Sequence, residues 1–349
     1  MHIYFILFFI TLAIQLLPAK SKREFNLKIV LSLLPFFLYV ALRYSCFDYI
    51  AYETLYHDIQ KDGVTYDPAS HHEYGWYVLN KIVPSYRFLV VFQSFIVFFS
   101  YYLVIKRHIT YKELAFFILL LFCIGDKSVF FMAQGMRNAI SISILIISIP
   151  LIQERKIWQY LLLALLAISF HTTAVIIFPL CYVVGRNSDM SKKELSVWIF
   201  VLLFLFITPV DTIIDTIAPH FLGVGAFNKY STYFEEESIS GTMTKMVGLV
   251  LATFILYHVG IEKCTKKDNS ILRLALLYIY FLYLGVLNGR AGQYFFVFLI
   301  LSVMSTLRNS NNKVMKYGYF FFVFFYFCLS LKKHSESPYS GFVYFLSYL

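Results

Sequence analysis

Long apolar runs, separated by short polar stretches, recur from one end of the chain to the other. A helix needs about 20 apolar residues to cross a hydrocarbon core about 30 Å thick, and somewhat fewer where its ends snorkel. The pattern therefore predicts an all-α, polytopic integral membrane protein with about twelve transmembrane helices. The predicted spans are 2–18, 29–42, 88–105, 113–125, 138–152, 157–170, 172–185, 194–210, 243–260, 271–287, 292–307 and 315–331.

The composition favours one membrane domain over residues 1–349. Hydrophobic residues make up 59% of the chain and charged residues only 14%, whereas a soluble domain carries about 25% charged residues. So few charges cannot cover a water-facing surface. Residues 2–18 lack a basic n-region and a small-residue cleavage site, so we expect a retained span there and not a signal peptide. The five cysteines are scattered without a CxxC pair, which predicts neither a disulfide framework nor a metal site.

The apolar run 157–185 predicts a tight helical hairpin. Its length alone also fits one long tilted helix. Basic residues flank it on both sides, however, with Arg155 and Lys156 before it and Arg186 after it. The positive-inside rule places both flanks in the cytoplasm. The chain must then turn back near His171.

The charges are distributed unequally between the two predicted sides of the membrane. The loops assigned to the inside together hold 19 Lys/Arg and 7 Asp/Glu, and the rest of the chain holds 11 Lys/Arg and 13 Asp/Glu. This asymmetry predicts that both termini lie outside. It also accounts for the net charge of +10 without a nucleic-acid partner. The inside loops are 19–28, 106–113, 153–156, 186–194, 262–273 and 308–316.

Two long, acidic loops, about 43–87 and 211–242, fall on the outside. The first contains a half-apolar stretch, 73–84, which predicts a short amphipathic helix lying on the membrane surface and ending at Pro84. His71 and His72 stand beside Glu73, but the side chains of adjacent residues diverge and make a poor chelate. We therefore predict no metal here.

Ionisable residues at the outer ends of the spans are the candidate functional groups. Arg43, Arg137 and Arg290 each lie at such an end, and His171 lies at the predicted hairpin turn. Charges are costly near a membrane and mark function by default. One topology brings all of them to one depth on one face, with Asp48 and Glu73 in the adjoining loop.

Three arginines at an outer leaflet suit a lipid-linked pyrophosphate. A guanidinium binds phosphate oxygens bidentately and stays charged when partly buried. Fixed cations also stabilise the charge that develops on a departing pyrophosphate. Asp48, Glu73 or His171 could accept the proton of an attacking hydroxyl group. Gln134 shares a helix face with Arg137, three residues later.

At these positions the sequence resembles the EpsG-type branch of the Wzy-like bacterial polysaccharide polymerases. The carrying motifs are Arg43-x4-Asp48-Tyr49-x2-Tyr52, Glu73-Tyr74-Gly75-x4-Asn80, Arg137-Asn138-Ala139, the apolar run ending in Ser169-Phe170-His171-Thr172-Thr173, and Gly289-Arg290 with Tyr294-Phe295. The resemblance runs from about residue 40 to 185, with a weaker echo near 290. Family glycines are replaced by Ser45 and Phe47, Glu-Pro-Gly reads Glu73-Tyr74-Gly75, and Arg-Gln reads Arg137-Asn138.

The resemblance implies an enzyme that joins undecaprenyl-pyrophosphate-linked repeat units on the outer face of the cytoplasmic membrane, without nucleotide sugar, cofactor or metal. It implies pyrophosphate binding by the three arginines, acceptor activation by His171 or Asp48, and sugar contacts through Glu73 and Asn80. Further candidate partners are a flippase and chain-length regulator proteins. A GT-C-like architecture is a matching analogy at the level of the fold. Tyr52, Gln134, Asn138 and Tyr294 complete the candidate substrate-binding residues.

Other functions remain open at this point. A lipid-linked sugar flippase or another transporter would often show related halves and polar groups at the bilayer midplane. The sequence shows no internal repeat, and its unusual charges gather at one face. A membrane acyltransferase would also use a histidine but would take its donor from the cytoplasm. A purely structural partner in glycan assembly would not need the arginine set.

Overall fold

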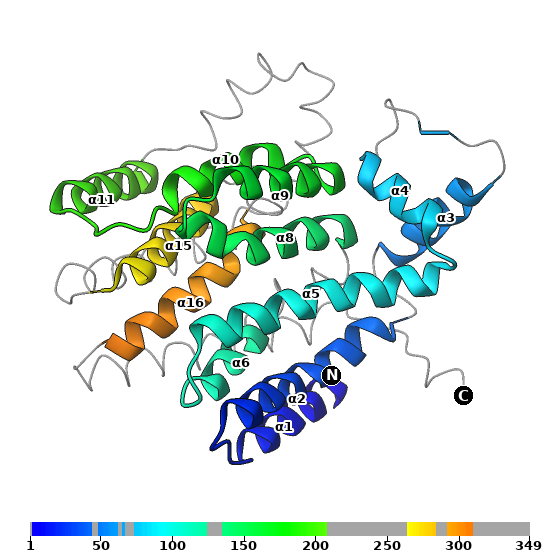
Figure 1. Cartoon of the computed structure of the whole chain (residues 1–349), viewed down its shortest axis with the longest axis horizontal. Helices are drawn as coiled ribbons and strands as arrows, with labels where there is room; N and C mark the ends of the chain where they lie inside the picture. Colours follow the sequence, from blue (N-terminus) through cyan, green and yellow to red (C-terminus); the bar gives the residue numbers. More distant parts are fainter. Residues whose placement is uncertain are drawn as a thin grey trace. The chain divides into compact units, whose positions relative to one another are not determined.

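The computed structural model describes residues 2–43, 48–61, 65–66, 73–123, 135–207, 264–283 and 292–309. The regular elements in these ranges are α-helices (Figure 1). They are α1 (His2–Gln15), α2 (Lys22–Ala41), α3 (Tyr49–Gln60), α4 (Tyr74–Ile82), α5 (Tyr86–His108), α6 (Leu114–Cys123), α8 (Met136–Gln153), α9 (Ile157–Phe170), α10 (Ala174–Val184), α11 (Lys192–Ile207), α15 (Lys266–Tyr283) and α16 (Gln293–Asn309).

Ten of the twelve predicted spans coincide with a helix, and the other two, 243–260 and 315–331, lie outside the described residues. The all-α prediction therefore holds wherever the chain is described. Three helices, α2, α5 and α8, are long and apolar enough to cross a membrane by length and composition. The number of crossings and the orientation of the termini stay predictions.

The distribution of residues around α5 is that of a membrane helix. Phe88, Val91, Phe95 and Phe99 follow one another at spacings of three and four and are exposed. The side of α5 that packs inside the protein instead carries Gln93, Ser94 and Ser100, each fully buried. A helix at a water-facing surface shows the opposite arrangement. Exposed apolar stripes of this kind suit contact with lipid chains.

The loop between α2 and α5 contains two short helices, one of which was predicted over 73–84. α3 and α4 both lie within the predicted outer loop 43–87, and α4 occupies most of the stretch expected to be amphipathic. Its last helical residue is Ile82, and Pro84 follows after one intervening residue. Trp76, Leu79 and Asn80 form the buried side of this helix.

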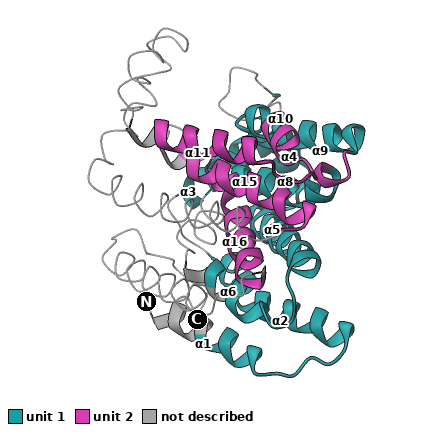
Figure 2. Cartoon of the chain, turned by 90° about the vertical axis from the view of Figure 1, so that its left-hand side faces the viewer, with its two compact units in different colours: residues 1–151, 156–178, 313–349 teal, residues 152–155, 179–312 magenta. Residues whose placement is uncertain are grey.

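The residues cluster into two compact units (Figure 2). Unit 1 comprises residues 1–151, 156–178 and 313–349, and unit 2 comprises residues 152–155 and 179–312. Both units contain strongly apolar helices. The division leaves the prediction of a single membrane domain as it was, because one membrane domain can contain two compact units.

In unit 1, two predicted inside loops meet at one end of the helices. Lys28, buried near the start of α2, donates hydrogen bonds to the carbonyl groups of Gln15 and Leu17 at 2.7 and 2.8 Å, at and just beyond the end of α1. Its ammonium group also lies 4.5 Å from the ring centre of Tyr111, in the loop before α6. A cation at the carbonyl end of a helix is favourable.

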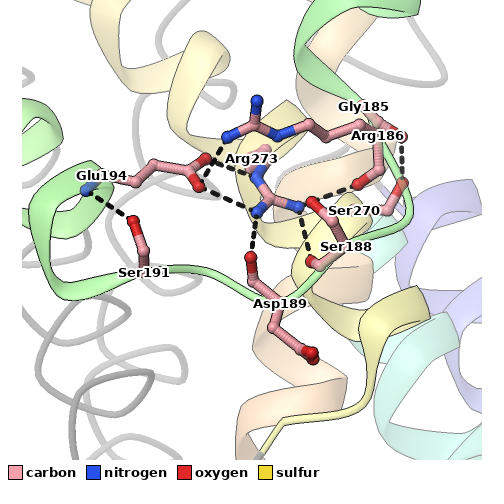
Figure 3. Close-up of polar contacts among 8 residues, drawn as sticks. All are labelled: Gly185, Arg186, Ser188, Asp189, Ser191, Glu194, Ser270 and Arg273. Atoms are coloured by element: carbon pink, nitrogen blue, oxygen red, sulfur yellow. Dashed lines mark hydrogen bonds and ion pairs between the residues drawn. The ribbon is translucent and has the colours of Figure 1, made fainter.

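In unit 2, Arg273 of α15 joins two further predicted inside loops (Figure 3). Its Nε and Nη2 donate to the carboxylate of Glu194 at 2.6 and 3.0 Å, and its other bonds go to the carbonyl groups of Arg186, Ser188 and Asp189. All five N–H donors of the guanidinium are thereby used. Arg273 is 1% exposed, so this network fixes the turn before α11 against α15.

Replacing Arg273 by methionine should lower the midpoint of heat denaturation of the purified protein by several degrees. The substitution removes five donors and leaves Glu194 with only the exposed Arg186, a loss of about 3 kcal/mol. Lys266→Met is the matched control, because Lys266 lies 3.9 Å from Asp189 and both are exposed. Equal midpoints for Arg273→Met and the wild type would contradict a structural role for the network.

The predicted orientation can be tested with single cysteines in a cysteine-free background. Lys61→Cys lies at the end of α3 in the predicted outer loop, and Lys267→Cys lies near the start of α15 in a predicted inside loop. Both side chains are exposed. On intact cells a membrane-impermeant maleimide should label position 61 and not position 267. Labelling of position 267 alone would mean that the chain is inserted the other way round.

Candidate active site

Glu73, at the start of α4 in unit 1, contacts two segments that are distant in the sequence. Its Oε2 accepts a hydrogen bond from Arg137 Nη1 of α8 at 2.5 Å. Its Oε1 accepts a hydrogen bond from the backbone N–H of Thr172 at 3.1 Å. The side chain of Glu73 is 11% exposed and that of Arg137 is 20% exposed. A carboxylate at the first turn of a helix is further stabilised by the helix dipole.

His171 is the second ionisable neighbour of Glu73. Its Nδ1 lies 3.8 Å from Glu73 Oε1, and its side chain is 10% exposed. The backbone N–H of Thr173 donates to the same Nδ1 at 3.4 Å. With Nδ1 as acceptor, the hydrogen of a neutral ring is on Nε2, and a hydrogen on Nδ1 instead faces Glu73. The negative charge of Glu73 therefore favours the form of His171 with a hydrogen on Nδ1.

The break in the predicted hairpin is what brings His171 and Thr172 to this position. α9 ends at Phe170, and His171 adopts an extended conformation with φ −156° and ψ 120°. The chain turns over the next two residues, and α10 starts at Ala174. The Thr172 N–H has left the helical ladder at this point, so it needs another acceptor. Farther along, the Tyr160 hydroxyl donates to the carbonyl group of Phe178 at 2.8 Å, which holds the two helices of the hairpin together.

Gly75 allows α4 to approach the end of α9 closely. A Cβ atom at this position would overlap the hydroxyl group of Ser169 and would lie 2.7 Å from the Ser169 carbonyl oxygen. Contacts this short do not occur for real Cβ atoms, so only glycine fits without a shift of the backbone. Because Glu73 is two residues before Gly75, this close packing sets the position of the carboxylate beside the turn.

Tyr52 connects α3 to the same group of residues. Its hydroxyl group interacts with Arg137, and its ring lies edge-on to Trp76, with 5.4 Å between the centroids. Trp76 is fully buried. The Tyr52 backbone N–H donates to the carbonyl group of Asp48, a half-buried residue at the start of α3. The structure therefore brings Tyr52, Glu73, Arg137 and His171 together, from four helices.

Arg43 belongs to a neighbouring polar group at the same end of unit 1. It is fully buried and donates from Nη1 to the Val40 carbonyl at 2.6 Å and from Nη2 to Gln93 Oε1 at 3.3 Å. Arg87 of α5 donates to the Arg43 carbonyl group.

The pKa of Tyr49 is raised by burial and, to a smaller extent, by the negative charge of Glu53. The positive charges of Arg87 and Arg43 act in the opposite direction and lower it.

The contacts of Tyr86 show that the Arg43 group and the Glu73 group lie at the same end of unit 1. Its hydroxyl group donates to the Tyr49 carbonyl at 3.0 Å and lies 3.9 Å from the sulfur of Met136. Met136 directly precedes Arg137, and Arg87 directly follows Tyr86. Within unit 1, the contacts place Arg43, Asp48, Glu73, Arg137 and His171 at one end of the helices. That this end faces outside, and that these residues are functional, stay predictions.

The combination of these residues with the order of their motifs can be compared with known families. The sequence model of the EpsG family matches residues 26–345, which is most of the chain. The chain belongs to the EpsG family. No curated protein and no solved structure gives a significant match. The expected GT-C-like architecture of this EpsG-family protein therefore stays a prediction.

The other candidate residues have different places. Asn80 is fully buried, and its amide donates to the Trp76 carbonyl at 2.7 Å, so it packs within α4. Asn138, the neighbour of Arg137, is 3% exposed. Tyr294 belongs to unit 2, where its ring is fully buried in α16. Gln134 and Arg290, together with His71 and His72, lie outside the described residues.

Two features of this EpsG-family site, Arg87 and the Thr172 N–H, were not predicted from the sequence. Arg87 lies at the start of α5, on the predicted outer side, where the insertion bias disfavours a positive charge. The same signal singled out Arg43. The Thr172 N–H is a backbone donor, so no side-chain pattern indicates it. Glu73 contacts Arg137, His171 and the Thr172 backbone. The sugar contact expected of Glu73 stays a prediction.

Gly75→Ala should separate α4 from the end of α9. The added methyl group has no space beside Ser169, and overpacking of this kind costs about 1–3 kcal/mol. We expect a lower midpoint of heat denaturation in detergent. Ser169→Ala is the matched control and should be nearly neutral, because it removes only a hydroxyl group bonded within α9. A Gly75→Ala protein as stable as the wild type would show that the two helices do not pack as described.

Proposed function

We propose that this EpsG-family protein is a glycosyltransferase that joins undecaprenyl-pyrophosphate-linked oligosaccharide repeat units into a surface polysaccharide. The observation that carries the proposal is the Glu73 carboxylate, which holds Arg137 and the His171 turn together in residues that match the family pattern. The outer face of the cytoplasmic membrane is the proposed location. It rests on the charge asymmetry of the loops.

His171 is the proposed general base. A hydroxyl group of the incoming repeat unit attacks the anomeric carbon of the growing chain, and its proton passes to His171 Nε2. This requires Nε2 to be free of hydrogen. The ring hydrogen must then be on Nδ1, where it replaces the hydrogen bond from the Thr173 N–H and is donated to Glu73 Oε1. The observed separation of 3.8 Å is long for a hydrogen bond, and such contacts often tighten only when substrate is bound. Glu73 is thus a positioning residue in the proposal.

Arg137 is the proposed stabiliser of the leaving group. As the new glycosidic bond forms, the bond between the anomeric carbon and the pyrophosphate oxygen breaks, and the lipid pyrophosphate leaves with the electron pair. The negative charge that develops on it is stabilised by a fixed guanidinium. Glu73 holds that guanidinium in place through its Oε2. Arg43 and Arg290 complete the proposed set of cations, and Asp48 remains a second candidate base.

The decisive experiment is reconstitution of the purified protein with lipid-linked repeat units from its host, without nucleotide sugar or metal. A ladder of products on a gel should appear with the wild type. The rate of chain growth should fall about 10²–10³-fold in Arg137→Ala and about 10²–10⁴-fold in His171→Ala. Lys61→Ala, an exposed cation on the same predicted side, should leave the rate unchanged. Wild-type protein that yields no ladder but moves the labelled lipid across vesicles would replace the polymerase with a flippase.

Glu73→Gln should lower the rate of chain growth about 10²-fold or more while leaving the KM for the repeat unit nearly unchanged. Glutamine can still accept from Thr172, but it loses the ion pair with Arg137. It also cannot favour a hydrogen on Nδ1 of His171 by its charge. Glu53→Gln, which removes another carboxylate of the outer loop, is the control. If the effect fell on KM alone, Glu73 would act in substrate binding and its positioning role would be wrong.

A further inference from the structure

Three tyrosines gather next to Glu73 and take no part in the contacts described so far. The ring of Tyr66 lies 5.2 Å from that of Tyr74, nearly perpendicular to it, and 5.6 Å from that of Tyr77. Tyr74 is 59% exposed, and the other two are half-buried. We call Tyr66, Tyr74 and Tyr77 the tyrosine cluster.

The helix geometry separates the tyrosine cluster from the packed side of α4. Tyr74 and Tyr77 are three residues apart and share one helix face. The residues that α4 buries, Trp76, Leu79 and Asn80, are on another side. Tyr66 comes from the chain segment before α4 and places its ring against both tyrosines. The cluster is thus assembled from two segments, which holds the rings in a defined arrangement instead of leaving each to move alone.

The position of the cluster is as informative as its composition. Tyr74 directly follows Glu73, whose carboxylate lies 2.5 Å from Arg137 and 3.8 Å from His171. Tyr77 comes four residues after Glu73, and its backbone N–H donates to the Glu73 carbonyl group at 3.1 Å. The two residues therefore lie one helical turn apart on the same side of α4, and a molecule that rests on Tyr77 lies next to Glu73. The cluster is a continuation of the proposed active site along α4.

The chemistry of tyrosine matches a sugar ring better than it matches an acyl chain. One face of a pyranose carries C–H bonds and packs on an aromatic ring, while its hydroxyl groups point outward from the rim. Tyrosine offers both an apolar ring and a hydroxyl group that can donate and accept hydrogen bonds. It also binds at a low cost in conformational entropy, because it has only two side-chain torsions.

We infer that the tyrosine cluster binds a sugar of the lipid-linked oligosaccharide and so positions it beside Glu73, Arg137 and His171. This inference rests on the proposed function, which identifies a lipid-linked oligosaccharide as the molecule that carries the sugar. It names the substrate class that the cluster takes, a hexopyranose that presents the C–H bonds of one face. It also assigns the sugar contact to side chains for which the sequence analysis proposed no role.

The first test measures binding without catalysis. The probe is the free oligosaccharide repeat unit, released from the host polysaccharide and titrated onto the protein in nanodiscs by saturation-transfer NMR. Tyr74→Leu/Tyr77→Leu should weaken binding about tenfold, and the corresponding double Phe variant should weaken it much less. Trp158→Leu, an exposed aromatic residue at the other end of α9, should bind as the wild type does. Equal binding by the Leu and wild-type proteins would overturn the inference and identify the cluster as a membrane-interface belt.

The second test separates this inference from the proposed function. In the reconstituted reaction, the double Leu variant should raise the apparent KM for the lipid-linked repeat unit about tenfold and leave the rate at saturation within about twofold. A wild-type ladder with an unchanged KM in the variant would overturn the role of the tyrosine cluster and support the polymerase. Tyrosine-dependent binding of the free oligosaccharide without any ladder would support the cluster and overturn the polymerase.

Discussion

A carboxylate that water barely reaches needs donors on both of its oxygens, and Glu73 obtains them from two separate segments. Arg137 supplies one at the start of α8, and the Thr172 backbone supplies the other at the turn after α9. Without the carboxylate, Arg137 would lose its anionic partner in a largely buried position, which is costly, and the Thr172 N–H would lose its acceptor. The position of His171 follows from this arrangement, because it is the residue next to Thr172 in the turn.

The close packing around Glu73 depends on features that are unrelated to its charge. Gly75 has no side chain to hold α4 away from Ser169, and the chain leaves the helical conformation at His171. The helices behind this site bury their polar residues, such as Gln93 and Ser94 of α5, and expose phenylalanines. Most of the buried residues are nevertheless apolar, and the charged groups of this site lie at the helix ends.

The sequence predicts the helices well because a span must be both apolar and long, and few other segments are. It also predicts that Arg43, Glu73, Arg137 and His171 meet, since alternation across a membrane brings every second helix end to one face. It cannot tell which of these groups contact each other. Arg43 bonds to Val40 and Gln93 instead of joining Glu73. The Thr172 donor depends on how α4 packs against the end of α9, and the tyrosine cluster depends on how Tyr66 lies against α4. Hydropathy encodes neither.

The coupling between Glu73 and Arg137 tests the account most directly. Glu73→Gln, Arg137→Gln and the double variant would be compared by heat denaturation in detergent. If the carboxylate organises this end of unit 1, the two shifts do not add, and the double variant melts no lower than the more damaged single variant. Shifts that add would mean that Glu73 and Arg137 act independently, which contradicts the site described here.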